Sequence, residues 1–334
     1  MNPFRHFVVI CVRYHLSHIH RVIQILLQWT LYQLTWSKDR EDNTRIQYGM
    51  EINIQKIFGV KRGSNGASPW ITSVVCLPDD RIILADSGNP RILLYDQEGN
   101  LLNEISLHGK PRDMVLLDDN QLVMTFPNLL MIQFLHLEEL KVTKTAHIGY
   151  ECFGITRVAD KLIVTCGTHL ATLDVEGNLL GTTPTRNRSA RYICSDDRHN
   201  IYFTGWEFDA IHCISSSGAY SIIPADSSLK YCRALVVHDD SLLVVGRWSH
   251  NICRFTLDGE QREAIVTKAD GLDVPIALAL SANKPNTFLI TNNNGRSVVI
   301  CEMVDPSDKE EKGTIDEMCE EQAEKKEEDI KNSL

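Results

Sequence analysis

Short apolar runs recur along the middle of the chain, separated by polar turns. Six of them lie about forty residues apart and do not alternate apolar with polar positions: Ile82–Ala85, Leu122–Met124, Leu162–Val164, Ile201–Phe203, Leu242–Val245 and Phe288–Ile290. A strand without such alternation has both faces buried, as when it packs between two neighbouring sheets. The runs therefore predict six buried strands, one in each of six repeated units.

Two kinds of turn mark these units. An acidic turn precedes most of the buried runs, at Asp79-Asp80, Asp118-Asp119, Asp160, Asp196-Asp197 and Asp239-Asp240. A glycine turn follows the next strand, at Gly99, Gly177, Gly218 and Gly259, with spacings of 78, 41 and 41 residues. Glycine supplies the positive φ angle of tight hairpins. The spacing of 78 is two units of 39, and the skipped unit carries Glu138-Glu139, which must turn in another way.

Each unit reads as a strand, an acidic turn, a buried strand, a loop, a third strand, a glycine turn and an outer strand. Six such units predict an all-β fold, a six-bladed β-propeller of four-stranded blades over residues 51–304. The sixth unit lacks a fourth strand, and an orphan strand, Ile52–Val60, precedes the first unit. We expect this N-terminal strand to form the outer edge of the last blade and close the ring.

The two ends differ from the middle. Residues 1–50 contain an apolar stretch whose residues Ile23, Leu26, Leu27, Leu31 and Leu34 fall near one face of a helix. It predicts an amphipathic helix that packs on the propeller, another chain or a membrane surface, the alternative being a segment without function. Residues 305–334 carry 12 acidic and 5 basic side chains and few apolar ones, so we expect a disordered acidic tail.

Composition narrows the partners and the compartment. The formal net charge is −10, which argues against DNA as a ligand. None of the ten cysteines forms a Cys-x-x-Cys pair, and Cys76, Cys194, Cys253 and Cys301 lie in apolar runs where they read as small buried hydrophobes. These features predict a cytoplasmic protein with no metal site and no cofactor.

One unit carries a recognisable signature. The segment Ile83-Leu84-Ala85-Asp86-Ser87-Gly88-Asn89-Pro90-Arg91-Ile92 resembles the NHL repeat, and Thr291-Asn292-Asn293-Asn294-Gly295-Arg296 is a weaker version of it. The chain is thus similar to the C-terminal propellers of TRIM-NHL-like proteins. Those proteins are often ubiquitin ligases with RING, B-box and coiled-coil modules before the propeller, and no such module precedes residue 51. The resemblance therefore implies the half that binds a ligase substrate or another partner.

One face of the propeller is predicted to be basic and aromatic. Both kinds of turn fall on one face, so the loops between second and third strands and between blades fall on the other. These loops carry the candidate binding residues, namely Lys110, Arg112, Tyr150, Arg186, Arg188, Arg191, Tyr192, Trp206, Lys230, Tyr231, Arg233, Arg247, Trp248 and Arg296. Arginines interleaved with aromatics suit a protein hot spot or phosphate contacts with base stacking. The competing interpretation is that they pack between neighbouring blades.

Catalytic motifs are missing from the sequence. It has no Gly-x-Ser-x-Gly, P-loop or His-Glu-x-x-His motif, and its histidines are scattered. We therefore expect a binding scaffold that recruits a protein partner and is not an enzyme. A single-stranded RNA-binding propeller is the first alternative, and a calcium-dependent propeller hydrolase is the second. A membrane is expected as a partner only through residues 1–50.

Overall fold

The computed structural model describes residues 51–304, except for 187–188, 206–209, 226–227 and 261. The chain divides into two units, Met1–Gly49 and Met50–Leu334, and the second holds all the described residues. The helix predicted within 1–50 and the disordered tail predicted over 305–334 lie outside them. Within the described part, no helix is long and apolar enough to cross a membrane.

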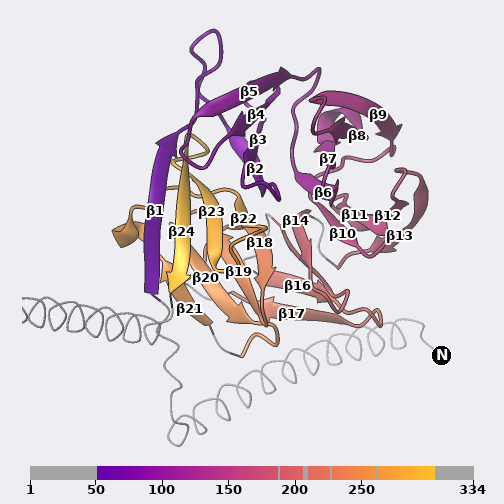
Figure 1. The fold of residues 1–334 in the computed structure, drawn as a ribbon. Helices are drawn as coiled ribbons and strands as arrows, with labels where there is room; N and C mark the ends of the chain where they lie inside the picture. The colour runs from indigo at the N-terminus through magenta and orange to yellow at the C-terminus, as the bar shows by residue number, and fades with distance from the viewer. Residues whose placement is uncertain (1–50, 187–188, 206–209, 226–227, 261, 305–334) are drawn as a thin grey trace, which may run out of the picture. The chain divides into compact units, whose positions relative to one another are not determined.

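Six antiparallel sheets of four strands make up the described part, as predicted (Figure 1). Each sheet is one blade. The innermost strands, one in each blade, are β2 (Ile71–Cys76), β6 (Met114–Asp118), β10 (Ile155–Val158), β14 (Ala190–Ser195), β18 (Cys232–His238) and β22 (Leu278–Leu280). The second strands are β3 (Ile82–Asp86), β7 (Gln121–Phe126), β11 (Lys161–Thr165), β15 (Ile201–Gly205), β19 (Ser241–Gly246) and β23 (Thr287–Asn292).

The third and outer strands complete the blades. The third strands are β4 (Arg91–Tyr95), β8 (Met131–His136), β12 (His169–Asp174), β16 (Ala210–Ile214), β20 (Asn251–Thr256) and β24 (Ser297–Val304). The outer strands of blades 1 to 5 are β5 (Leu101–Ser106), β9 (Lys141–His147), β13 (Leu179–Pro184), β17 (Tyr220–Pro224) and β21 (Arg262–Val266). Two short 3-10 helices, Pro127–Leu129 and Lys268–Asp270, lie in loops.

The predicted closure of the ring is confirmed. Strand β1 (Glu51–Gly59) pairs antiparallel with β24 from Glu51↔Val304 to Gly59↔Ser297, and so forms the outer edge of blade 6. Figure 1 shows indigo β1 beside yellow β24. Hydrogen bonds therefore tie the first described strand to the last one and join blade 6 into the ring.

The second strands are buried on both faces because their side chains point alternately to the two neighbouring blades. On β3, Ile82 and Leu84 belong to the apolar cluster shared with blade 6, whereas Ile83 and Ala85 belong to the cluster shared with blade 2. Every residue of β3 is buried. This packing explains the apolar runs without alternation, and Cys76, Cys194, Cys253 and Cys301 lie buried in the same clusters as free thiols.

The turns follow their sequence signals. The glycines of blades 1, 3, 4 and 5 have φ angles of 81° (Gly99), 84° (Gly177), 85° (Gly218) and 79° (Gly259). Blade 2, which lacks this glycine, places Leu140 in the left-handed region instead, with φ at 51°. An L-residue with a side chain adopts that conformation at a cost, so the packing of blade 2 must offset it.

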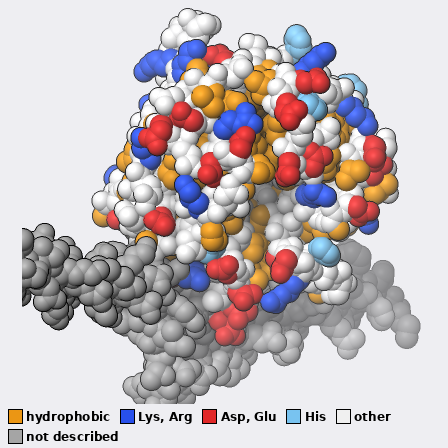
Figure 2. Space-filling model, viewed as in Figure 1, with side chains coloured by type: hydrophobic (Ala, Val, Ile, Leu, Met, Phe, Trp, Pro, Cys, Tyr) orange, Lys and Arg blue, Asp and Glu red, His pale blue; other side chains and the backbone are white. Residues whose placement is uncertain are grey.

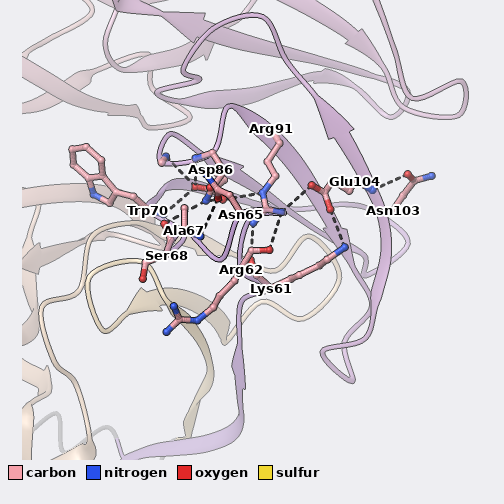
Figure 3. Close-up of polar contacts among 12 residues, drawn as sticks. Lys61, Arg62, Asn65, Ala67, Ser68, Trp70, Asp86, Arg91, Asn103 and Glu104 are labelled. Carbon is pink, nitrogen blue, oxygen red and sulfur yellow. Dashed lines mark hydrogen bonds and ion pairs between the residues drawn. The ribbon is translucent and has the colours of Figure 1, made fainter.

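The NHL-like signature of blade 1 forms a buried polar network near the seam (Figure 3). One oxygen of Asp86 accepts from the backbone nitrogens of Trp70, Gly88 and Asn89 at 2.9, 3.0 and 3.1 Å. Its other oxygen accepts from Arg91 Nε at 3.0 Å. Arg91 also donates to the Lys61 carbonyl oxygen at 2.6 Å and to Glu104 at 2.8 Å. The signature therefore fixes the loop that links β1 of blade 6 to β2 of blade 1.

Candidate functional site

Each blade places one residue, at the start of its inner strand or just before it, at the mouth of the central channel. The equivalence of these positions is visible in the backbone, since Arg112 N donates to Thr125 O at 2.8 Å, Phe153 N to Thr165 O at 2.9 Å and Ile276 N to Thr291 O at 3.0 Å. The six equivalent residues, one for each blade, are Thr72, Arg112, Phe153, Arg191, Arg233 and Ile276. Three of the six are arginines, so cations gather at this end of the channel.

A threonine of the preceding blade holds several of these positions. The Oγ1 atoms of three second-strand threonines donate to carbonyl oxygens of the next blade: Thr125 to Phe153 at 2.6 Å, Thr165 to Arg191 at 3.2 Å and Thr204 to Arg233 at 2.8 Å. All three threonines are buried at zero exposure. Each blade thus fixes the backbone from which the next mouth residue projects.

Two of the arginines meet at one tyrosine across the mouth. Tyr192 of β14 is 5% exposed, and its hydroxyl accepts from Arg112 Nη2 at 2.5 Å and from Arg233 Nη1. Arg112 belongs to blade 2, Tyr192 to blade 4 and Arg233 to blade 5. The Arg112–Tyr192 hydrogen bond therefore bridges two blades that are not neighbours, and the Arg233–Tyr192 bond joins adjacent blades.

Aromatic faces support the guanidinium groups. Arg191 Cζ lies 3.3 Å from the ring centroid of Phe153, and Arg233 Cζ lies 4.9 Å from that of Tyr231. A fourth arginine, Arg247 in the loop between β19 and β20, lies 5.9 Å from the Tyr231 centroid and donates from Nη2 to Asn294 Oδ1 at 2.7 Å. We call Arg112, Arg191, Arg233 and Arg247 the arginine cluster. Cation–π contacts of this kind stabilise the side chains and leave N–H donors available at the edges of each guanidinium.

The arginine cluster is under electrostatic strain. Burial, and then the neighbouring cations, lower the pKa of Arg191 and of Arg247. Arg233 is only 2% exposed, and the Nε atoms of Arg233 and Arg247 are buried without a hydrogen-bond partner within the described residues. No ion pair joins Arg112, Arg233 or Arg247 to an acidic side chain in that part of the chain. Buried cations are ordinarily paired, so this arrangement calls for an anion.

Two carboxylates act electrostatically on arginines of the cluster. Glu151, which is exposed, acts electrostatically on Arg191. Asp113 follows Arg112 and accepts from Ser73 Oγ at 2.7 Å and from Ile155 N at 3.0 Å. Burial raises the pKa of Asp113 to about 6, although these hydrogen bonds oppose the shift. Asp113 is thus held toward the channel wall by other donors.

The raised pKa of Asp113 predicts a pH dependence of stability. Its pKa is about 6 in the folded protein against an ordinary value of 3.8, so the folded state keeps a proton that the unfolded state has lost between these values. The stabilisation of the folded state by this proton is fully present below about pH 4 and is lost as the pH rises through 6. Between pH 4 and 7, the free energy of unfolding of the wild type should fall relative to that of Asp113→Asn by at most about 3 kcal/mol. Urea titrations at each pH measure this, and a constant difference between the two proteins would contradict it.

Behind the mouth lies the central channel. A cavity of about 330 Å³ is lined by the six inner strands, with Thr72, Ser73, Asp113 and Tyr192 in its wall among mainly apolar residues. The face visible in Figure 2 is hollowed near its centre, and basic and acidic side chains are interspersed around the hollow. Within the described residues, no three His, Cys, Asp or Glu side chains are grouped to hold a metal ion.

The structure brings together half of the predicted binding residues. Contacts link Arg112, Tyr192, Tyr231, Arg233, Arg247 and Trp248 at the mouth, and Arg191 lies over Phe153 within electrostatic reach of Arg112. Other predicted residues lie elsewhere in these loops. Arg186 lies 5.0 Å from the ring centroid of Tyr220 on the outer strand β17, Tyr150 packs edge-on against His169, and Lys110, Lys230 and Arg296 are exposed. Arg188 and Trp206 lie outside the described residues.

Three residues at the mouth are not among the predicted binding residues: Asp113, Phe153 and Asn294. Phe153 carries no charge and reads as a core residue, yet its ring is the platform of Arg191. A signal existed, because Phe153 occupies the same repeat position as Arg112 and Arg191. Aligning the six units on their inner strands, and not on their turns, finds it.

No protein-family model and no curated protein sequence matches the chain. Solved structures do match. A catalytically inactive virginiamycin B lyase from Staphylococcus aureus with quinupristin shares a TM-score of 0.57 and 13% identity, over 76% of this chain and 100% of its own. A streptogramin B lyase structure has a TM-score of 0.57 and 12% identity, over 77% of this chain and 99% of its own.

These matches correct one prediction. The sequence predicts a protein that is not an enzyme, and this prediction is contradicted because the matching solved structures named above are lyases. Missing hydrolase motifs say nothing of a reaction that uses other groups on the same scaffold. The comparisons do not confirm the resemblance to NHL-repeat and TRIM-NHL proteins. At 12 to 13% identity, the likeness establishes that the chain has the six-bladed β-propeller fold of these lyases.

Proposed function

We propose that this propeller binds a protein partner through the arginine cluster and the aromatic side chains beside it. The observation that carries the proposal is the set of four arginines at the channel mouth, three of which form no ion pair within the described residues. Bringing like charges together in a partly buried place costs free energy. An anionic group on a partner offsets that cost, and therefore contributes to binding more than an exposed ion pair does.

An exposed aromatic pair lies next to the cluster and supplies apolar contact area. The rings of Tyr231 and Trp248 are stacked, with centroids 4.4 Å apart and planes inclined by 13°. Trp248 is 62% exposed. Tryptophan, tyrosine and arginine are the residues most enriched at the centres of protein interfaces. Both Arg233 and Arg247 lie over the ring of Tyr231. A partner that covers Trp248 would therefore also lie close to these two arginines.

The geometry favours a protein over single-stranded RNA. An RNA strand needs cations along a track and successive exposed aromatic faces on which its bases stack. Here Arg112 and Arg233 converge on the Tyr192 hydroxyl, and Tyr192 itself is buried. Tyr231 and Trp248 stack on each other, and Trp248 is the exposed ring of the pair. A single anionic group with an apolar neighbour fits this arrangement better than a chain of phosphodiesters.

The resemblance of blade 1 to NHL repeats supports the same proposal. It would make the partner a ubiquitin-ligase substrate or cofactor, an idea that rests on Asp86, Asn89 and Arg91 alone. Binding at the mouth is equally compatible with a reaction on the bound ligand, as in the lyases that share the fold. The partner's identity decides between these roles.

A charge-removal experiment tests the proposal. The tagged full chain is used to capture proteins from an extract of the cells that express it, and each captured protein is purified and titrated back by calorimetry. We expect the double variant Arg112→Met, Arg233→Met to weaken that binding by about a hundredfold, since each charged hydrogen bond contributes about tenfold or more.

The matched control is Arg198→Met. Arg198 is an exposed arginine in the turn between β14 and β15, on the opposite face, and it pairs only with exposed Asp240 in the described structure. Its loss should leave affinity within about twofold, because exposed ion pairs contribute little. Equal binding by the wild type and the double variant would refute the proposal. Retention of RNA that weakens steeply with salt, and is lost in the double variant, would replace the protein partner with RNA.

A further inference from the structure

We infer that the anionic group bound by the arginine cluster is a phosphate monoester on a side chain of the protein partner. This inference rests on the proposed function and adds the chemistry of the contact. It predicts that the partner binds in its phosphorylated form.

The arginines of the cluster approach the mouth from different directions. Arg112 projects from blade 2, Arg191 from blade 4, and Arg233 and Arg247 from blade 5. A carboxylate is planar and has two oxygens, which one guanidinium satisfies in a bidentate pair. A phosphate monoester is tetrahedral and has three terminal oxygens that accept strong hydrogen bonds. Guanidinium groups that converge from three blades therefore match the phosphate group better.

The net charge of the arginine cluster also favours a phosphate group. Arg112, Arg233 and Arg247 form no ion pair within the described residues, and Asp113 is the carboxylate that acts on Arg112, which leaves these four groups with a local charge of +2 when Asp113 is ionised. A carboxylate from the partner neutralises half of this excess. A phosphate monoester carries about −1.5 to −2 near neutral pH and neutralises nearly all of it.

The arginines of the cluster are already held in place by contacts with their neighbours. Arg191 lies on Phe153, Arg233 on Tyr192 and Tyr231, and Arg247 is held by Asn294. Arg233 is 2% exposed, and its Nε has no hydrogen-bond partner in the described part of the chain. Side chains that are already held in place lose little conformational entropy when the ligand binds, so a small tetrahedral anion can be recognised tightly.

The test uses the full-length chain and three peptides that differ in one side chain. Acetylated pentaglycine amides carry serine, glutamate or phosphoserine at the central position, and affinity is measured by isothermal titration calorimetry at fixed ionic strength. We expect the phosphoserine peptide to bind at least about tenfold more tightly than the glutamate peptide, and the serine peptide to show no binding. Inorganic phosphate should bind more weakly than the phosphoserine peptide, because it lacks the peptide backbone.

Two variants of the cluster and one control locate the site. Arg233→Met and, separately, Arg112→Met should each weaken the phosphoserine peptide by about tenfold or more. Arg112 is less buried than Arg233, so one of the two remains informative if burial makes the other unstable, and circular dichroism checks the fold of both. Arg198→Met on the opposite face should bind like the wild type.

Three outcomes overturn the inference: equal affinity for the phosphoserine and glutamate peptides, equal loss of affinity in Arg198→Met, or tighter binding of inorganic phosphate than of the phosphoserine peptide. The last outcome would make the cluster a site for free phosphate. If phosphoserine fails but the double variant Arg112→Met, Arg233→Met still loses the captured partner, the phosphate inference is wrong and the proposed function stands. If the phosphoserine peptide does not bind and the double variant keeps the captured partner, both the phosphate inference and the proposed function are wrong.

Discussion

Replacing Phe58 with alanine should destabilise the propeller by about 3–5 kcal/mol, whereas Ile57→Ala on the same strand should change its stability by less than about 0.5 kcal/mol. Phe58 is 9% exposed and packs in the apolar cluster between blades 1 and 6, with its ring centroid 5.2 Å from that of Tyr95. Ile57 is 56% exposed. The two positions are neighbours on strand β1 and occupy opposite faces of it.

The reason for the large effect is that β1 closes the ring. It contributes the outer edge of blade 6 and packs against blade 1, so weakening it opens the seam between the first and last blades. Deleting residues 51–59 should therefore remove cooperative unfolding altogether. Urea unfolding followed by circular dichroism measures all three variants. Equal effects of Phe58→Ala and Ile57→Ala would show that the seam does not limit stability.

Replacing Asp86 with alanine should cost about 3–5 kcal/mol, because it removes the buried ion-pair partner of Arg91 Nε and leaves three backbone N–H groups without their acceptor. The Asp86 and Arg91 side chains are 0% and 4% exposed, and the charged atoms lie 3.0 Å apart. The loss falls on the loop between β1 and β2, which Arg91 holds through the carbonyl oxygen of Lys61.

The control for this prediction is the neighbouring exposed pair. The Lys61 side chain is 55% exposed and lies 3.0 Å from Glu104, so Lys61→Met should change the free energy of unfolding by less than about 0.5 kcal/mol. Its backbone contacts are kept in this variant. Thermal and urea unfolding of both proteins give the comparison. If Asp86→Ala lowered the free energy of unfolding by less than about 1 kcal/mol, the prediction would be wrong, and water would be able to replace the Asp86 hydrogen bonds.

The repeat could be recognised in the sequence because turns depend on local chemistry. Gly99, Gly177, Gly218 and Gly259 occupy the left-handed region that glycine adopts freely, and their spacing revealed the period. The missing fourth strand of the last unit and the orphan strand before the first were likewise visible as a count, and β1 pairs with β24 as predicted. Leu140 shows the limit of such signals, since its positive φ has no local cause in the sequence.

The candidate site could be predicted only as a list of loop residues. Arg186 and Arg191 lie five positions apart, yet Arg186 packs over Tyr220 of an outer strand and Arg191 over Phe153 at the mouth. Arg186 follows the outer strand β13 of blade 3, whereas Arg191 lies on the inner strand β14 of blade 4. Their closeness in the sequence does not reveal this difference, because the pairing of strands within each sheet decides which strand is inner and which is outer.

By itself, the sequence determined the number of blades, the order of the strands and the closing strand. Each of these follows from local turn chemistry and from burial of both faces of the second strands. The tertiary structure alone decided that Arg112, Tyr192 and Arg233, from blades 2, 4 and 5, meet at one hydroxyl group. Closing six blades into a ring brings together positions that lie about forty residues or more apart, and no local interaction encodes that convergence.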